Sequence, residues 1–244
     1  MKILLVNDDG FKAKGIRVLA NKLAGKHSVI VAAPKSASSG FSHSLSLGRI
    51  IKVKYKVIDN LDYHIISGTP CDCVKYGLLS ICPDVDIVIS GINDLTNVGT
   101  DCVYSGTVNA AFEGGILGKP ALAVSMNAPN GYYDDVATFI LNNLDYLKSL
   151  SNGEFVPTIN FENEHKENWK GIRFTEVGEK KYNDWYEKCG KGYILKGNLI
   201  PPKGDENVDV VANLNGYVSL SISRLTCESI VIENKEEESK KICW

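Results

Sequence analysis

The sequence predicts an α/β fold built on a doubly wound, mostly parallel sheet. The first observation behind this prediction is that a strand, a helix and a second strand follow one another within about 33 residues of the N-terminus. Such a βαβ unit is right-handed and implies parallel strands. The second is that short runs rich in Ile, Leu and Val recur along the first half of the chain, as in strands buried on both faces.

The chain opens with this βαβ unit. An apolar strand is expected at Lys2–Val6, and apolar residues at helical spacing predict a helix at Lys14–Leu23, which Gly25 ends. A second buried strand follows at Ser28–Ala33, closed by Pro34. The turn after the first strand is acidic rather than glycine-rich, so a dinucleotide pyrophosphate would be repelled there unless a metal intervened.

A hairpin and a capped helix come next. The runs 50–57 and 62–66 are expected to pair around Asp59-Asn60. A helix is then expected at about 71–81, because Thr69 as a cap followed by Pro70 at an early helical position is typical of a helix start.

The alternation of strands and helices continues to residue 150. Strands are expected at 86–90 and 121–125, and helices at 108–117 and 137–150. A polar loop at 91–101, with two glycines, two asparagines and two aspartates, follows the first of these strands. Loops in this position of an α/β sheet carry function.

The composition changes after about residue 152. Three further strands are expected, at 157–160, 171–175 and 217–222. The stretch around Trp185 is typical of a long excursion such as a hairpin arm. We therefore expect a catalytic core at 1–150 and a C-terminal portion at 151–244 that completes the core and forms an extended arm.

The composition also restricts the partners and the compartment. A formal net charge of -2 disfavours a nucleic-acid partner. No apolar run approaches the ~20 residues that span a bilayer, and no signal-peptide pattern opens the chain, so we expect a cytoplasmic protein without a membrane partner. The seven cysteines are odd in number and irregularly spaced, which argues against a disulfide framework. The four histidines are scattered, which argues against a zinc site, and the charged run at 234–241 carries no functional signal.

Two adjacent carboxylates stand where the first strand ends, in Asn7-Asp8-Asp9-Gly10. Like charges side by side are costly unless a cation lies between them. Taken alone, this tetrapeptide is more typical of a solvated turn. The other polar segments of the chain are needed to distinguish a solvated turn from a metal site.

Polar segments from different parts of the chain are expected at the same sheet edge, because ligands bind outside the carboxyl ends of parallel strands. These segments are 7–10, 38–40, 91–93 and 105–107. They offer carboxylates, hydroxyls, an amide oxygen and a helix N-terminus. All-oxygen ligands suit Mg²⁺ or Mn²⁺, and a helix N-terminus favours phosphate. The combination is the one that phosphoryl chemistry needs.

The sequence resembles the survival protein E (SurE) family, which consists of metal-dependent 5′-nucleotidases. The resemblance is dense over residues 1–125 and continues weakly at 216–219. Its motifs are MKILLVNDDG at 1–10, Ser39-Gly40, Gly68-Thr69-Pro70 with Asp72, PDVDIVISGIN at 83–93 and YSGTVNAAFEG at 104–114. The family implies a Rossmann-like three-layer sandwich, an extended C-terminal hairpin or swap region exchanged between subunits, and a homodimer or homotetramer.

The resemblance also implies roles for individual residues. One divalent cation per subunit, Mg²⁺ or Mn²⁺, would be bound by Asp8, Asp9, Ser39 and Asn93. The family's phosphate-binding Ser-Gly-Thr would fall on Ser105, Gly106 and Thr107. We also expect Gly40 to contribute to phosphate or substrate binding, and Asn97 either to support the metal ligands or to bind substrate. Asp8 is the expected catalytic residue, either as the group that activates a water or as the nucleophile itself.

The chain departs from the family pattern at two places that matter here. Leu95 stands where the family usually has the second glycine of G-I-N-x-G-x-N, which alters the loop between Asn93 and Asn97. The Pro-Leu pair that the family has after G-Y-V-S-I-T is missing from 219–226, a segment that belongs to the expected swap region.

The expected reaction is hydrolysis of nucleoside 5′-monophosphates to nucleoside and phosphate, with 3′-nucleotides and polyphosphate as further substrates to be tested. One alternative is a non-catalytic metal- or nucleotide-binding protein. A second is a receiver-like signalling module, although a receiver has ~120 residues, about half this length. A third is a haloacid dehalogenase-type phosphatase, which needs D-x-D, whereas the two aspartates here are adjacent.

Overall fold

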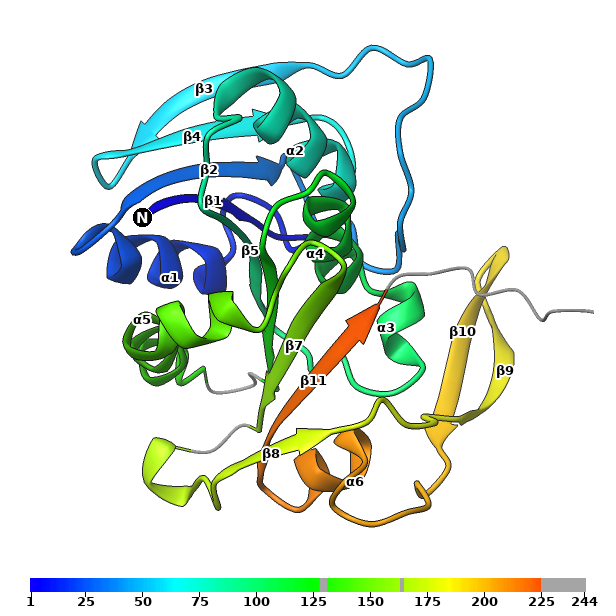
Figure 1. Cartoon of the computed structure of the whole chain (residues 1–244). Coiled ribbons are helices and arrows are strands. Elements are labelled where there is room, and N and C mark those ends of the chain that lie inside the picture. Colours follow the sequence, from blue (N-terminus) through cyan, green and yellow to red (C-terminus); the bar gives the residue numbers. More distant parts are fainter. Residues whose placement is uncertain (128–130, 163–164, 225–244) are drawn as a thin grey trace, which may run out of the picture.

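A computed structural model of the chain describes residues 1–127, 131–162 and 165–224. The charged run at 234–241 and the last residues of the 219–226 segment lie outside the described residues. The described part forms one nine-stranded sheet with helices on both faces, and a separate two-stranded hairpin (Figure 1). This confirms the predicted α/β fold.

The sheet has the strand order β3-β4-β2-β1-β5-β6-β7-β11-β8. The strands from β4 to β7 in this order are parallel to one another, whereas β3, β11 and β8 run in the opposite direction. Their bounds are β1 (Lys2–Val6), β2 (Ser28–Pro34), β3 (Val53–Ile58), β4 (Leu61–Ile66), β5 (Ile87–Asn93), β6 (Ala121–Met126), β7 (Phe155–Phe161), β8 (Ile172–Thr175) and β11 (Val218–Arg224).

Each face of the sheet is covered by two main helices. On one face α1 (Lys14–Ala24) and α5 (Tyr133–Ser149) bury their apolar sides in one core cluster. On the other, α2 (Pro70–Tyr76) and α4 (Gly106–Ile116) pack in a second cluster. Two short helices, α3 (Asp101–Tyr104) and α6 (Asp209–Leu214), complete the described helices together with short π- and 3₁₀-helical segments at Gly77–Ile81 and Lys166–Asn168.

Local sequence signals account for several of these elements. The β3–β4 turn lies at Asp59 and Asn60, both with positive φ, a conformation that Asp and Asn tolerate. The Thr69 hydroxyl accepts a hydrogen bond from the Asp72 amide at 3.1 Å, and the Asp72 carboxylate accepts one from the Thr69 amide. This capping box confirms the predicted start of the helix, which changes to a π-helical turn at Gly77–Ile81.

The strand expected at 86–90 runs further than the sequence indicated. β5 continues to Asn93, so the first three residues of the expected loop belong to the strand. Gly91 permits this because a Cβ there would lie 2.2 Å from the carbonyl oxygen of Val124 on β6. The pairing shifts register between Ser90 and Asn93, which leaves Asn93 opposite Ser125 at the strand end. The helix expected at 137–150 begins four residues earlier, at Tyr133.

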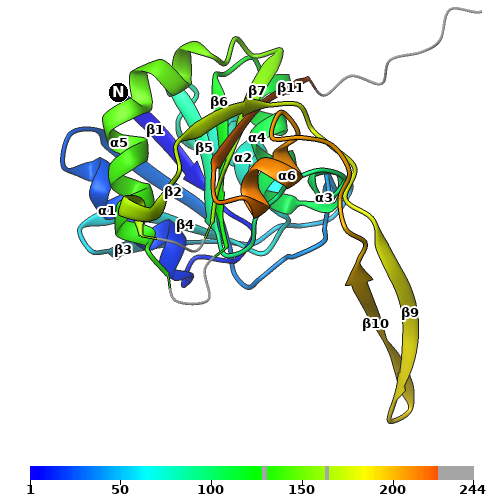
Figure 2. The same cartoon turned by 90° about the horizontal axis from the view of Figure 1, so that it is seen from below.

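A two-stranded hairpin leaves the body of the molecule in the C-terminal portion. It consists of β9 (Tyr182–Cys189) and β10 (Gly192–Leu199), and every residue of both strands is exposed. Figure 2 shows it projecting well away from the sheet. β7, β8 and β11 of the same portion belong to the main sheet. The division at residue 150 and the role of the arm in oligomerisation stay predictions.

Within the described ranges, the structure contains no helix with the length and hydropathy required to cross a membrane.

Candidate active site

A cavity of about 520 Å³ opens at the carboxyl ends of the central strands. Residues from the end of β1, the loop after β2, the end of β5 and the start of α4 all line it. Most of the predicted site residues are among its lining: Asp8, Asp9, Ser39, Gly40, Asn93, Asn97 and Ser105. Gly106 and Thr107 do not line the cavity but lie directly behind Asp8.

Asp8 is held in place by α4. Its carboxylate oxygen Oδ1 accepts a hydrogen bond of 2.5 Å from the hydroxyl of Thr107, and only 4% of the residue is exposed. Burial raises the pKa of Asp8 above its ordinary value, an effect that the hydrogen bond from Thr107 opposes. The first turn of α4 thus fixes the orientation of the predicted catalytic carboxylate.

Gly106 allows α4 to approach Asp8 this closely. A Cβ at Gly106 would lie 2.8 Å from the Cβ of Asp8 and 2.9 Å from its Oδ2. Any larger residue would therefore push the carboxylate and the helix apart. In the structure Gly106 has a packing role, and its predicted phosphate binding stays a prediction.

Asp9 lines the same cavity as Asp8. Burial, followed by the negative charges of Asp8 and Asp94, raises the pKa of Asp9 to about 7. Its oxygen Oδ2 is buried and has no hydrogen-bond partner within the described residues. Two crowded carboxylates, one with an unsatisfied buried oxygen, fit a site for a divalent cation.

Ser39 and Asn93 supply the uncharged oxygens of the predicted ligand set. The backbone N–H of Ser38 donates to the carbonyl oxygen of Asp8 at 2.7 Å, which ties the Ser39 loop to the end of β1. The amide Nδ2 of Asn93 donates to the carbonyl oxygen of Leu95 at 2.5 Å, so its Oδ1 is the atom available as a ligand. The donors are all oxygen, as Mg²⁺ and Mn²⁺ prefer.

The predicted ligand set contains only two carboxylates, and it contains no thiolate and no imidazole. Among residues 1–127, 131–162 and 165–224, no three His, Cys, Asp or Glu side chains are grouped so that they could hold a metal ion. The predicted set combines two carboxylates with a hydroxyl and an amide, so its fit rests on the oxygen chemistry above.

The helix N-terminus at α4 has a defined cap. The hydroxyl oxygen of Ser105 accepts a hydrogen bond of 3.0 Å from the backbone N–H of Val108, which is N-cap geometry. Ser105 also lines the cavity, so the positive end of the helix dipole is directed at the site. Phosphate binding by Ser105 and Thr107 stays a prediction.

Asn97 lines the cavity, and most of its polar groups hold the loop after β5. Its side-chain Nδ2 donates to the hydroxyl of Ser125 at 2.8 Å, and its backbone N–H donates to Asn160 Oδ1 at 2.7 Å. Asn160 returns a hydrogen bond to the Asn97 carbonyl at 3.2 Å. These contacts position the loop, and a contact between Asn97 and substrate stays a prediction.

The chain is similar in sequence to proteins of a known family. A family model described as "Survival protein SurE" matches residues 3–184. The chain belongs to the SurE family. It is 38% identical over 237 residues to the 5′-nucleotidase SurE of Clostridium beijerinckii, with 91% of this chain and 92% of the relative covered. It is 37% identical over 248 residues to the 5′-nucleotidase SurE of Kosmotoga olearia, with 97% and 98% covered.

The fold also matches that of a solved SurE protein. The crystal structure of the SurE protein from Aquifex aeolicus superimposes with a TM-score of 0.81 at 31% identity, and 98% of each chain is covered. The predicted family and the predicted fold class are both confirmed.

Part of the cavity of this SurE chain was not expected from the sequence. Lys180 and Tyr182, at the base of the hairpin, line it together with Asp101. Lys180 Nζ lies 2.6 Å from Asp101 Oδ2, and the Tyr182 hydroxyl donates to the same oxygen at 3.0 Å.

The far wall of the cavity is formed by residues that lie beyond the end of the family match at residue 184: Leu199, Val210, Asn213 and Leu214. No local motif marks these residues, whereas Asp94 and Asp101 lie in the polar loop that the sequence had singled out.

The C-terminal portion also fixes that loop. The Asp209 carboxylate on α6 accepts hydrogen bonds from the backbone N–H groups of Gly99, at 2.8 Å, and Gly178, at 2.9 Å. One buried side chain therefore joins the loop after β5 to the segment that leads into the arm.

Proposed function

We propose that this chain is a divalent-metal-dependent 5′-nucleotidase that hydrolyses nucleoside 5′-monophosphates to nucleoside and phosphate. The observation that carries the proposal is that the paired carboxylates Asp8 and Asp9 share one cavity with Ser39, Asn93 and the capped N-terminus of α4. The name 5′-nucleotidase, borne by relatives that are 37% and 38% identical over most of the chain, supports the same reaction.

One cation per subunit, Mg²⁺ or Mn²⁺, would be held by the oxygens of Asp8, Asp9, Ser39 and Asn93. When bound, such a cation neutralises charge on the phosphate oxygens and acidifies a coordinated water. The Oδ2 of Asp9, which has no hydrogen-bond partner among the described residues, and the raised pKa values of both aspartates support this assignment. A cation would give that oxygen a partner and would stabilise the ionised form of both carboxyl groups.

The chain's own residues orient the reacting groups. The Thr107 hydroxyl holds one oxygen of Asp8, which leaves the other to direct the attacking oxygen or to accept its proton. Ser105 and the free N–H groups of the first turn of α4 bind the phosphate, whose negative charge the helix dipole favours. We assign Asp8 the role of activating the nucleophile.

The proposal extends to a homodimer or homotetramer formed through the β9–β10 arm. The arm exposes large apolar side chains, among them Trp185, Tyr186 and Leu195, which are more favourable against a second copy than in water. A cytoplasmic location is part of the same proposal. It is supported by the five cysteines among the described residues, which are all free thiols, as in a reducing compartment.

The test is phosphate release from nucleoside 5′-monophosphates in Mg²⁺ or Mn²⁺, with and without a chelator. We expect chelation to abolish turnover, and Asp8→Asn to lower kcat by about 10³-fold because the acid–base group is lost. Asp145→Asn, at an exposed position of α5, is the matched control and keeps native kcat. Near-native turnover by Asp8→Asn, or turnover that the chelator leaves unchanged, contradicts the proposal.

A further inference from the structure

A second cavity, of about 330 Å³, lies beside the edge strand β3 and is lined by lysines. We call it the lysine groove. Its rim carries Lys35, Lys52, Lys54 and Lys56, and the apolar side chains of Phe11 and Ile65 form its floor. No carboxylate from the described part of the chain lines it.

The positive charge of this groove is uncompensated. Within the described ranges, none of the four rim lysines forms an ion pair with a carboxylate. The two aspartates of the same hairpin are engaged elsewhere: Asp59 pairs with Arg17 at 2.7 Å, and Asp62 accepts from the Tyr55 hydroxyl at 2.5 Å. A net charge of -2 for the whole chain therefore conceals a local concentration of cations.

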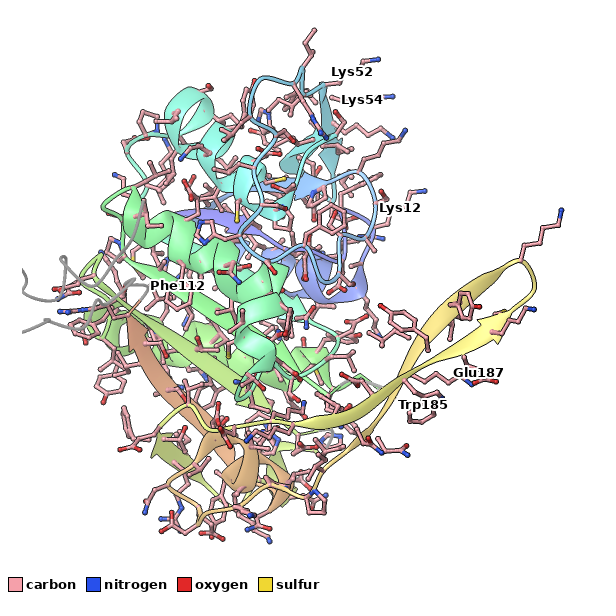
Figure 3. All side chains as sticks on the ribbon, turned by 90° about the vertical axis from the view of Figure 1, so that its right-hand side faces the viewer. Lys12, Lys52, Lys54, Phe112, Trp185 and Glu187 are labelled. Carbon is pink, nitrogen blue, oxygen red and sulfur yellow. The ribbon has the colours of Figure 1, made fainter. Side chains whose placement is uncertain are left out.

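The arrangement of the lysines follows from strand geometry and loop position. In the β3–β4 register Lys54 is opposite Ile65 and Lys56 is opposite Tyr63, so alternate residues of β3 point to one face. Figure 3 shows Lys52 and Lys54 projecting on the same side as Lys12, which follows β1. Lysines on an edge strand also prevent edge-to-edge pairing, but Lys35 lies on a loop, where this role does not apply.

A neighbouring cavity continues the groove towards the catalytic cavity. It has a volume of about 480 Å³ and shares Lys35 and Ser67 with the lysine groove. It adds Arg49 and ends at Ser38, the residue before Ser39 of the catalytic cavity. Cations and hydroxyls thus follow one another along the loop after β2.

The chemistry of the groove selects its ligand. A cationic rim binds a chain of phosphates, and an aromatic and apolar floor contacts bases or sugars, the combination found in sites for single-stranded nucleic acids. An inorganic phosphate chain would gain nothing from Phe11 and Ile65. We propose that the lysine groove binds a single-stranded oligonucleotide, with its phosphodiester backbone along the lysine rim. The proposal concerns binding and does not depend on the proposed nucleotidase activity.

The test is fluorescence anisotropy of a labelled single-stranded oligothymidylate with the full chain at several salt concentrations, in chelator so that no turnover interferes. We expect binding that weakens with salt. The triple substitution Lys52→Gln, Lys54→Gln and Lys56→Gln should weaken it at least about tenfold and lower the slope of log K against log salt by about 2, since each single-strand phosphate contact contributes about 0.7.

Controls separate this site from general charge effects. Lys26→Gln, Lys188→Gln and Lys191→Gln remove the same charge from exposed positions elsewhere and should leave binding unchanged. Phe11→Leu keeps an apolar side chain but removes the aromatic ring, so it should weaken binding of the oligonucleotide and not that of inorganic polyphosphate. Thermal unfolding checks that each variant is folded.

Three results would overturn the proposal. They are an absence of oligonucleotide binding, an equal loss in the control triple variant, and binding of polyphosphate without binding of the oligonucleotide. The hydrolysis of nucleoside monophosphates by the groove variants is measured separately, so failure of this proposal and failure of the nucleotidase assignment give different results.

Discussion

At the residue scale, the contact between Gly106 and Asp8 sets the geometry of the candidate site. The absence of a side chain at Gly106 lets the first turn of α4 lie against the carboxylate, and Thr107 then reaches Asp8 with its hydroxyl. The Ser-Gly-Thr motif therefore positions an aspartate, in addition to any contact that it makes with phosphate.

Gly106→Ala should lower kcat strongly although alanine favours the helix. The new Cβ would lie 2.8 Å from that of Asp8 and displace the carboxylate, and a shift of about 1 Å in a reacting group costs about 10²-fold. Steady-state kinetics measure the effect. Gly25→Ala is the control, since its Cβ would meet only the Lys22 carbonyl oxygen at 3.5 Å. Equal activity of the two variants would remove this role from Gly106.

Thr107→Val should reduce kcat about tenfold, or ~1.4 kcal/mol, because the shape is kept while one hydrogen bond to a charged group is lost. Thr107→Ser restores the hydroxyl and should recover most of the rate. The comparison is made on kcat and KM separately, and we expect KM to change less than kcat. If serine fails to rescue, the methyl group of Thr107 matters more than its hydroxyl.

At the scale of elements, α4 joins the loops of the candidate site to the second core cluster. Glu113 on α4 is buried, and its carboxylate contacts both Lys75 of α2 and His43, whose Nε2 lies 2.7 Å away. His43 follows the Ser39 loop, and its Nδ1 lies 3.2 Å from Asn109 Oδ1. One carboxylate therefore ties α2, α4 and this loop together.

This network predicts a dependence of stability on pH. Burial alone would raise the pKa of Glu113, but hydrogen bonds from His43 and Lys75 outweigh it and hold the pKa below the ordinary 4.5. The contribution of Glu113 is thus present above pH 4.5 and is lost as the pH falls through the lower folded-state value.

Glu113→Gln should be less stable than the native chain at pH 7 and lose less stability on acidification. Denaturant unfolding at pH values from 7 downwards measures both effects. The control is Glu187→Gln on the exposed arm, which should follow the native profile. An unchanged acid dependence in Glu113→Gln would show that other carboxylates control it.

Most elements of the sheet could be predicted because burial imposes a simple pattern. β1, β2 and β6 are apolar runs between turn residues, and α1 repeats apolar residues at helical spacing. The end of β5 could not be placed in this way. Its last residues, Gly91 to Asn93, look like a loop locally and are held in the strand by β6.

At the scale of the whole molecule, the wall of the cavity formed by the ends of the central strands was predictable from the sequence. The wall formed by the C-terminal portion was not. Asp8 comes just after the end of β1 and Asn93 is the last residue of β5, so both carry their signal locally, next to apolar runs. Lys180, Leu199 and Leu214 reach the cavity only through the tertiary path of the C-terminal portion, and none stands in a motif. Their contacts are long-range, and periodicity in a single sequence does not contain that information.

Removal of the β9–β10 arm should change the size of the particle in solution. Replacing 182–199 with a short glycine linker removes the exposed apolar strands and keeps the ion pair between Lys180 and Asp101. Light scattering after gel filtration should give a multiple of 26.7 kDa for the native chain and a single chain for the variant. A native monomer, or a variant that stays oligomeric, would exclude the arm as the contact between copies.

The bond between Asp209 and Gly99 has a consequence for synthesis of the protein on the ribosome. Asp8 is made at the start of translation, but Gly99 in the loop after β5 gains its partner only when Asp209 has emerged, 110 positions later. At 5–20 residues per second, about 10–40 s separate the synthesis of Asp8 from that of this last anchor. A nascent or truncated chain would therefore carry the aspartates without a finished cavity, and hydrolysis would begin only when translation is nearly complete.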